Sequence, residues 1–202
     1  SDESRGLGDV YKRQQLIGTT SLRRKAQLLK LNSELQIKDV RGNVDTRIKK
    51  MIDGDYDGLV MAAAGIERLK LEKYITEYLD FNLFMSAPGQ GAIAVETNAQ
   101  NLEIKKIVST INDTDSMICT TNERDFMKSM GGGCNYPIGA YSNIIENKIF
   151  LEGIVLSLDG KKSIRYEVES LNREENLAPK LSKKFFDNDV SSLLNEIDNE
   201  IK

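Results

Sequence analysis

Three units of strand, turn and helix follow one another in the first third of the chain, and they restrict its fold more than any other feature. Each unit is a short apolar run, a polar turn and then apolar residues at helical spacing. Repetition of strand and helix is typical of a parallel sheet, so the pattern predicts an α/β domain. The expected strands end near Gly18 and span Leu35–Val40 and Leu59–Ala64, and the expected helices are about Leu22–Leu31, Val44–Ile52 and Ile66–Leu71.

Two pairs of arginines and two hydroxyl side chains stand where the first two of these helices begin. A helix N-terminus offers unpaired amides and the positive end of a dipole, so arginines there are not placed for helix stability alone. If the two strands are neighbours, both pairs can reach one anion outside the carboxyl ends of the strands. A solvated basic helix start is the alternative. The candidate anion-binding residues are Thr20, Ser21, Arg23, Arg24, Arg41 and Arg47.

The middle of the chain combines a shaped turn with further helix. A proline and two glycines surround Gln90, which favours a turn over a linker, and Ala92–Glu96 then reads as a strand. More helix is expected at Glu72–Leu79. Another helix is predicted over Asn101–Ile111, with its apolar residues on one face.

A thiol flanked by three glycines follows a predicted helix at Ser116–Met130. The glycines and Pro137 leave space around Cys134, so a bulky group can approach its sulfur, as at a point of covalent attachment. A helix C-cap beside a buried structural cysteine is the alternative, although one glycine would be enough for that cap.

Alternating residues after this loop predict a small α+β domain with a three-stranded antiparallel sheet. The expected strands are Ile138–Tyr141, Lys148–Leu158 and Ser163–Glu169, followed by helical patterns at Leu177–Phe186 and Val190–Ile197.

Composition removes several classes of function. The chain has no histidine, which excludes histidine-based triads and zincin motifs. A net charge of -3 argues against a general nucleic-acid binder, and no apolar run is long enough to predict a membrane span. The two cysteines form neither a disulfide framework nor a zinc motif, so both are expected to be free thiols of a cytoplasmic protein, and no metal site is predicted.

Four segments, in order, resemble the motifs of the porphobilinogen deaminase (hydroxymethylbilane synthase) family: Gly18–Arg24, Arg41–Arg47, Ser86–Gly91 and Gly132–Ala140. The resemblance implies a transferase of tetrapyrrole and haem biosynthesis that joins four porphobilinogen molecules into hydroxymethylbilane and releases ammonia. It also implies a periplasmic-binding-protein-like α/β domain and a dipyrromethane cofactor bound to Cys134 through a thioether.

The resemblance assigns roles to the candidate residues. Thr20, Ser21, Arg23 and Arg24 would hold the acidic groups of the cofactor, while Arg41 and Arg47 would line the substrate cleft. The catalytic aspartate of the family lies in a first domain upstream, so no catalytic residue is expected in this chain.

The resemblance also divides the chain. Residues 1–14 are expected to be a disordered or foreign leader, 15–91 the second family domain, 92–112 a segment returning to the first domain, and 113–202 the third domain. A full-length version would be a monomer without nucleic-acid or membrane partners, and this chain alone would be inactive. A non-catalytic anion-binding module and a pseudoenzyme fragment remain as alternatives.

Overall fold

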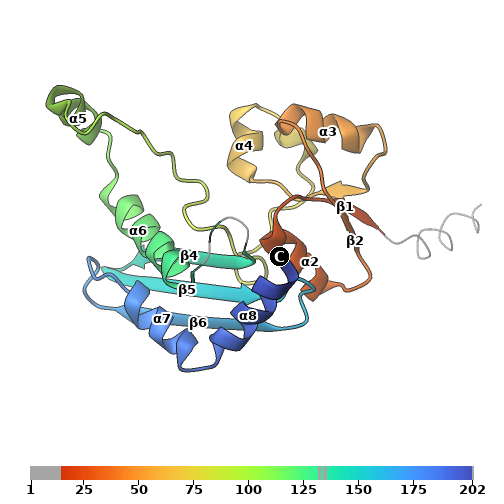
Figure 1. The fold of residues 1–202 in the computed structure, drawn as a ribbon. Coiled ribbons are helices and arrows are strands. Elements are labelled where there is room, and N and C mark those ends of the chain that lie inside the picture. The colour runs from red at the N-terminus through yellow and green to blue at the C-terminus, as the bar shows by residue number, and fades with distance from the viewer. Residues whose placement is uncertain (1–14, 132, 134–135, 202) are drawn as a thin grey trace, which may run out of the picture.

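The computed structural model describes residues 15–131, 133 and 136–201, and its elements form two sheets with helices around them (Figure 1). The first sheet is parallel, with strand order β2-β1-β3. The α/β domain is therefore confirmed. Its elements are β1 (Leu16–Gly18), α2 (Leu22–Leu31), β2 (Gln36–Lys38), α3 (Val44–Ile52), β3 (Gly58–Leu59), α4 (Ala63–Arg68) and the 3-10 helix η1 (Glu72–Tyr74).

Several of the expected elements in this domain differ from the structure in extent or position, and two of them differ most. The strand expected over Leu59–Ala64 is only β3, because the chain leaves the sheet after Val60 and begins α4 at Ala63. The helix expected over Glu72–Leu79 is a single turn, η1. Tyr78 and Leu79 are exposed, so no packing surface stabilises a longer helix there.

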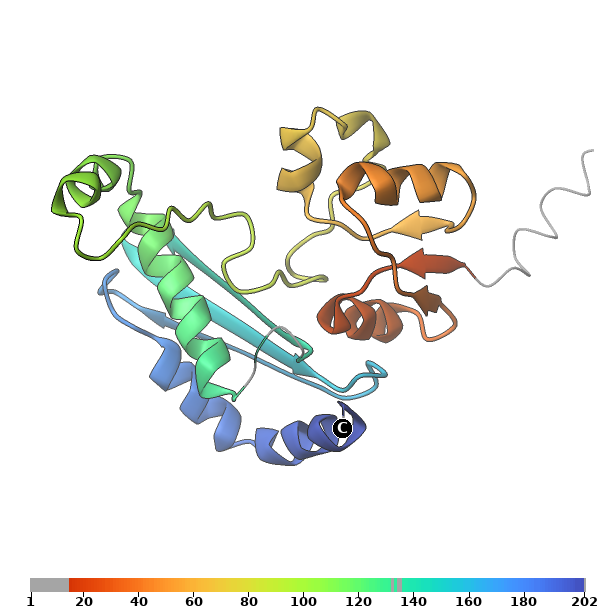
Figure 2. The ribbon, with the colours of Figure 1, turned by 45° about the horizontal axis from the view of Figure 1, so that its top comes forward.

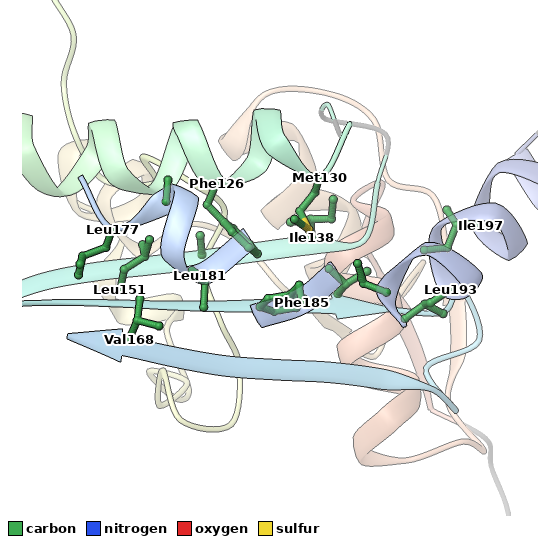
Figure 3. Packing of buried hydrophobic residues seen from close by; sticks show 14 of the residues in the cluster. Phe126, Met130, Ile138, Leu151, Val168, Leu177, Leu181, Phe185, Leu193 and Ile197 are labelled. Atoms are coloured by element: carbon green, nitrogen blue, oxygen red, sulfur yellow. The ribbon is translucent and has the colours of Figure 1, made fainter. Parts of the chain in front are cut away.

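The second sheet is antiparallel, with order β4-β5-β6, and confirms the predicted α+β domain. Alternate residues of β5, including Leu151 and Val155, face α6, α7 and α8, where Phe126 and Phe185 pack with ring centroids 5.0 Å apart (Figure 3). The elements are α6 (Thr114–Ser129), β4 (Ile138–Ile145), β5 (Lys148–Leu156), β6 (Ser163–Ser170), α7 (Ala178–Phe186) and α8 (Val190–Ile201).

The other face of β5 packs against the α/β domain. Ile154 and Leu156 form one buried cluster with Ala26 of α2 and Met85, which we call the shared cluster. Successive side chains of a strand point to opposite faces of the sheet. Ile154 and Leu156 therefore lie on the face of β5 opposite to the one that the helices cover. One strand thus contributes to the cores of both domains.

A long segment without strands leads from the α/β domain to α5 (Leu102–Ser109), which stands apart from both sheets (Figures 1 and 2). The strand expected over Ala92–Glu96 is absent there, and Ile93 is 91% exposed. A strand needs a neighbour to take its backbone hydrogen bonds, and this segment has none among the described residues. Ile104 and Ile107 are exposed, so the apolar face of α5 is uncovered.

Candidate anion-binding site

The site begins where β1 ends and α2 starts. Thr19 is buried, and its N–H donates to the carbonyl of Lys38 (3.0 Å), which joins β1 to β2. The hydroxyl oxygen of Ser21 caps α2 by accepting a hydrogen bond from the N–H of Arg24 (3.4 Å). Thr20 is exposed between them. This turn directs the first residues of α2 toward the carboxyl edge of the sheet.

Arg23 and Arg24 are each fixed at one end by a backbone carbonyl. Nη1 of Arg23 donates to the carbonyl of Met85, and Nη1 of Arg24 donates to that of Val60 (2.9 Å). The Nη2 atoms of both arginines donate to Oε1 of Gln90 at 3.4 Å. Arg23 is only 5% exposed. Two guanidiniums are therefore held in fixed positions with their outer ends directed at one point.

The electrostatics of this pair are unfavourable without a ligand. Burial, and then the charge of Arg24, lower the pKa of Arg23 from 12.5 to about 10. Burial, and then the charge of Arg47, lower the pKa of Arg24 as well. Neither arginine forms an ion pair with a carboxylate in the part of the chain that the structure describes. Both remain charged at neutral pH, so an anion bound here would be stabilised.

The second arginine pair is only partly brought into this cluster. β1 and β2 are parallel neighbours, as the expectation of one common anion required. Arg47 lies close enough for its charge to act on Arg24, and its Nε donates to the carbonyl of Gly42 (2.8 Å). Arg41 is exposed, and its side chain has no hydrogen bond or ion pair with a described residue. Its guanidinium is not held in the cluster.

Cys134 lies outside the described residues, but the residues that flank its loop on both sides are described. Met130 is buried in the core at the end of α6, and the carbonyl of Pro137 accepts a hydrogen bond from the N–H of Leu156 (3.1 Å). Between them, the hydroxyl of Tyr136 donates to Oδ1 of Asp198 in α8. The loop is therefore anchored on both sides.

The other cysteine, Cys119, is a free thiol, as expected. It is partly buried in α6, and this burial raises its pKa. A thiol with a raised pKa is a poor nucleophile at neutral pH. Cys119 is therefore less reactive than an ordinary exposed thiol.

Three polar residues of the site were not identified from the sequence. The side chain of Gln27 exchanges two hydrogen bonds with the backbone of Met85, at 2.7 and 3.1 Å, and so fixes the carbonyl that holds Arg23. Oε1 of Gln90 accepts a hydrogen bond from each guanidinium. In the same turn, the carboxylate of Glu123 accepts a hydrogen bond from the N–H of Gly89 (2.6 Å). The one available signal for Gln27 was its place one helical turn after Arg23.

Burial raises the pKa of Glu123, while the N–H groups of Gly89 and Ser142 lower it. The described residues contain no group of three or more metal-ligating side chains, and none of their helices has the length and apolar character needed to cross a bilayer.

The fold and this cluster define a two-domain protein in which two guanidiniums converge at the edge of a parallel sheet. Residues 3–106 match the family model "Porphobilinogen deaminase, dipyromethane cofactor binding domain", and residues 117–187 match "Porphobilinogen deaminase, C-terminal domain". The chain belongs to the porphobilinogen deaminase family. The members of this family are transferases of tetrapyrrole biosynthesis with a dipyrromethane cofactor.

Several curated porphobilinogen deaminases are similar to the chain. The protein of Syntrophomonas wolfei is 44% identical over 147 residues, which is 73% of this chain and 48% of the relative. That of Carboxydothermus hydrogenoformans is 42% identical over 182 residues, 90% of this chain and 58% of the relative. That of Chlorobaculum parvum is 39% identical over 168 residues, 83% of this chain and 54% of the relative. The chain thus spans about half the length of these relatives.

Proposed function

We propose that this chain is the part of a porphobilinogen deaminase that carries the cofactor and binds the carboxylates of its ligands. The complete enzyme would condense four porphobilinogen molecules into hydroxymethylbilane and release ammonia at each step. The observation that supports this proposal is a pair of anchored guanidiniums, those of buried Arg23 and half-buried Arg24, without a carboxylate partner among the described residues. Pyrrole ligands with acetate and propionate groups provide that partner.

The residues present fit a dipyrromethane. Arg23 and Arg24 have planar donor groups that suit carboxylates, and the exposed hydroxyl of Thr20 adds a donor beside them. The oxygen of Ser21 caps α2, so its hydroxyl proton is left to donate to the ligand. When bound through Cys134, the cofactor would supply the pyrrole carbon from which the product chain grows. Arg41 and Arg47 would hold the carboxylates of incoming substrate.

The assignment of domains follows the same proposal. Residues 15–91 and 113–202 would be the second and third family domains, and residues 92–112 would return to a first domain that bears the catalytic aspartate. The complete enzyme would work as a cytoplasmic monomer, with porphobilinogen as its small-molecule substrate and without nucleic acid. The matched segments cover only 48% and 58% of these two relatives, which leaves room for that domain.

Replacement of the proposed attachment residue tests this function. In an enzyme carrying this sequence, Cys134→Ala should abolish the colour reaction of a bound dipyrromethane with an acidic aldehyde reagent, because no other thiol is placed to form the thioether. Cys119→Ala is the matched control and should retain the colour. Colour that persists in Cys134→Ala would exclude Cys134 as the attachment site.

A further inference from the structure

Gln90 lies between the guanidiniums of buried Arg23 and half-buried Arg24. Its Oε1 accepts a hydrogen bond from Nη2 of Arg23 and another from Nη2 of Arg24, each at 3.4 Å. Nη1 of each arginine already donates to a backbone carbonyl. The two outer ends therefore converge on one point, and a neutral carboxamide oxygen occupies that point.

This arrangement suits an anion better than it suits Gln90. Hydrogen bonds between a guanidinium and a carboxylate are typically about 2.7–2.9 Å long, and both of their partners are charged. The observed 3.4 Å contacts are long, and the carboxamide brings no charge to balance the two cations. A ligand carboxylate at the same point would shorten both contacts and reduce the repulsion between Arg23 and Arg24.

The turn that carries Gln90 can release its side chain without rearranging. The N–H of Gln90 donates to the carbonyl of Ala87 (3.0 Å), and the N–H of Gly89 donates to the carboxylate of Glu123 (2.6 Å). These two bonds hold the backbone. The side chain itself is exposed, so rotation about its own bonds moves the carboxamide into water, where it stays hydrogen-bonded.

We infer that Gln90 is a neutral placeholder at the anion position between Arg23 and Arg24, and that a ligand carboxylate binds by displacing its side chain. The inference rests on the proposed function for the identity of the ligand, but not for the placement of Gln90. The consequence is selectivity. A neutral ligand group would bind no more tightly than the carboxamide that it displaces, whereas a carboxylate would gain binding free energy from the two charges.

The placement of Gln90 is tested without ligand. Gln90→Glu puts a carboxylate between the two guanidiniums, and it should raise the thermal unfolding midpoint of the purified chain at pH 7 by on the order of 3 °C or more. Gln100→Glu makes the same change at an exposed glutamine outside the site and should leave the midpoint unchanged. No rise in Gln90→Glu, or a rise that is undiminished when Arg24→Gln is added, would overturn the inference.

Displacement is tested by isothermal titration calorimetry of the cofactor-free chain, with porphobilinogen as a probe because it carries the same acetate and propionate groups as the cofactor. Gln90→Ala should bind it roughly two- to tenfold more tightly than the parent chain, because no hydrogen bonds need to be broken first, and Gln90→Glu should bind it at least about tenfold more weakly. Weaker binding by Gln90→Ala would show that the glutamine contacts the ligand and would overturn displacement, as would a lack of binding by both chains. Unchanged binding by Arg23→Gln would instead contradict the proposed function, while the melting comparison still decides where Gln90 lies.

Discussion

Buried arginines differ from exposed ones in how much of their geometry the protein fixes. Arg23 is 5% exposed and is anchored by the carbonyl of Met85, which Gln27 in turn holds in place. Arg41, by contrast, is exposed. An anchored guanidinium loses little further freedom when it binds a carboxylate, whereas a free one must be ordered at that moment. We therefore expect the two residues to respond differently to the same substitution.

Arg23→Lys should lower the free energy of unfolding by about 1–2 kcal/mol, because an ammonium cannot reproduce the planar donor pair toward Met85 and Gln90. Arg41→Lys should change it by less than about 0.5 kcal/mol. Urea unfolding of both variants provides the comparison. In an enzyme carrying this sequence, Arg41→Lys should weaken porphobilinogen binding and Arg23→Lys should weaken cofactor binding, each by roughly 1.5–3 kcal/mol. If the lysine variants turned over as fast as the parent enzyme, the planar guanidinium groups would not be needed for binding.

The sequence allowed the arginines to be identified as a group, but not the residues that position them. Their place after two strands predicts a common edge, since parallel strands end on the same side. Gln27 and Met85 are 58 residues apart in the chain, and local patterns carry no information about such a contact. The separation of Arg41 from the cluster was likewise not visible, because spacing does not say where a long side chain points.

At the scale of elements, α2 and the turn between β5 and β6 approach each other very closely. A Cβ on Gly160 would clash with the carbonyl oxygen of Ala26 and lie 2.6 Å from the backbone nitrogen of Lys30. Nearby, Nζ of Lys30 donates to the hydroxyl of Ser163 (2.7 Å). The absence of a side chain at residue 160 therefore lets the α/β domain lie directly on the hairpin.

Gly160→Ala should destabilise the chain by about 2–5 kcal/mol. Overpacking costs about 1–3 kcal/mol, and a left-handed backbone (φ 73°) adds about 1–2 kcal/mol for a residue with a Cβ. Gly54→Ala is the matched control, since Gly54 also has a positive φ (88°) but a Cβ added there would meet no atom within 4 Å. Chemical denaturation should show only the smaller loss in the control. Equal losses would mean that the close approach carries no cost.

The strands with partners inside the chain were predictable, whereas two elements expected without such partners did not form, although the helix α5 formed as predicted with its apolar face uncovered. The strands β4, β5 and β6 alternate clearly because one of their faces packs on helices. Ala92–Glu96 has the composition of a strand but no neighbouring strand, and Glu72–Leu79 has helical composition but no surface to cover. Propensity alone does not stabilise either element.

At the scale of the whole molecule, residues 92–111 form an apolar extension without a cover among the described residues. Ile93, Leu102 and Ile111 are 91%, 75% and 71% exposed. Exposed apolar surface of this kind favours association. The chain also spans only about half the length of its relatives.

The isolated 202-residue chain should therefore associate in solution and should not release ammonia from porphobilinogen in repeated turnovers. Sedimentation velocity should show self-association that decreases when Ile104 and Ile107 are both replaced by glutamate. Lys106→Glu places a glutamate on the opposite face of α5 and should not have this effect. Sustained ammonia release by the chain alone would contradict the placement of the catalytic aspartate outside it.

The shared cluster has a further consequence for the dynamics of the protein. Among the described residues, the α/β domain buries few large apolar side chains of its own, and Ala26 and Met85 pack on Ile154 and Leu156 of the other domain. A domain with so few buried apolar side chains of its own is not expected to unfold locally without also disturbing β5, against which it packs. Amide protons of α2 should consequently exchange with solvent no faster than those of β5 at its contact, so that both elements belong to one cooperative folding unit.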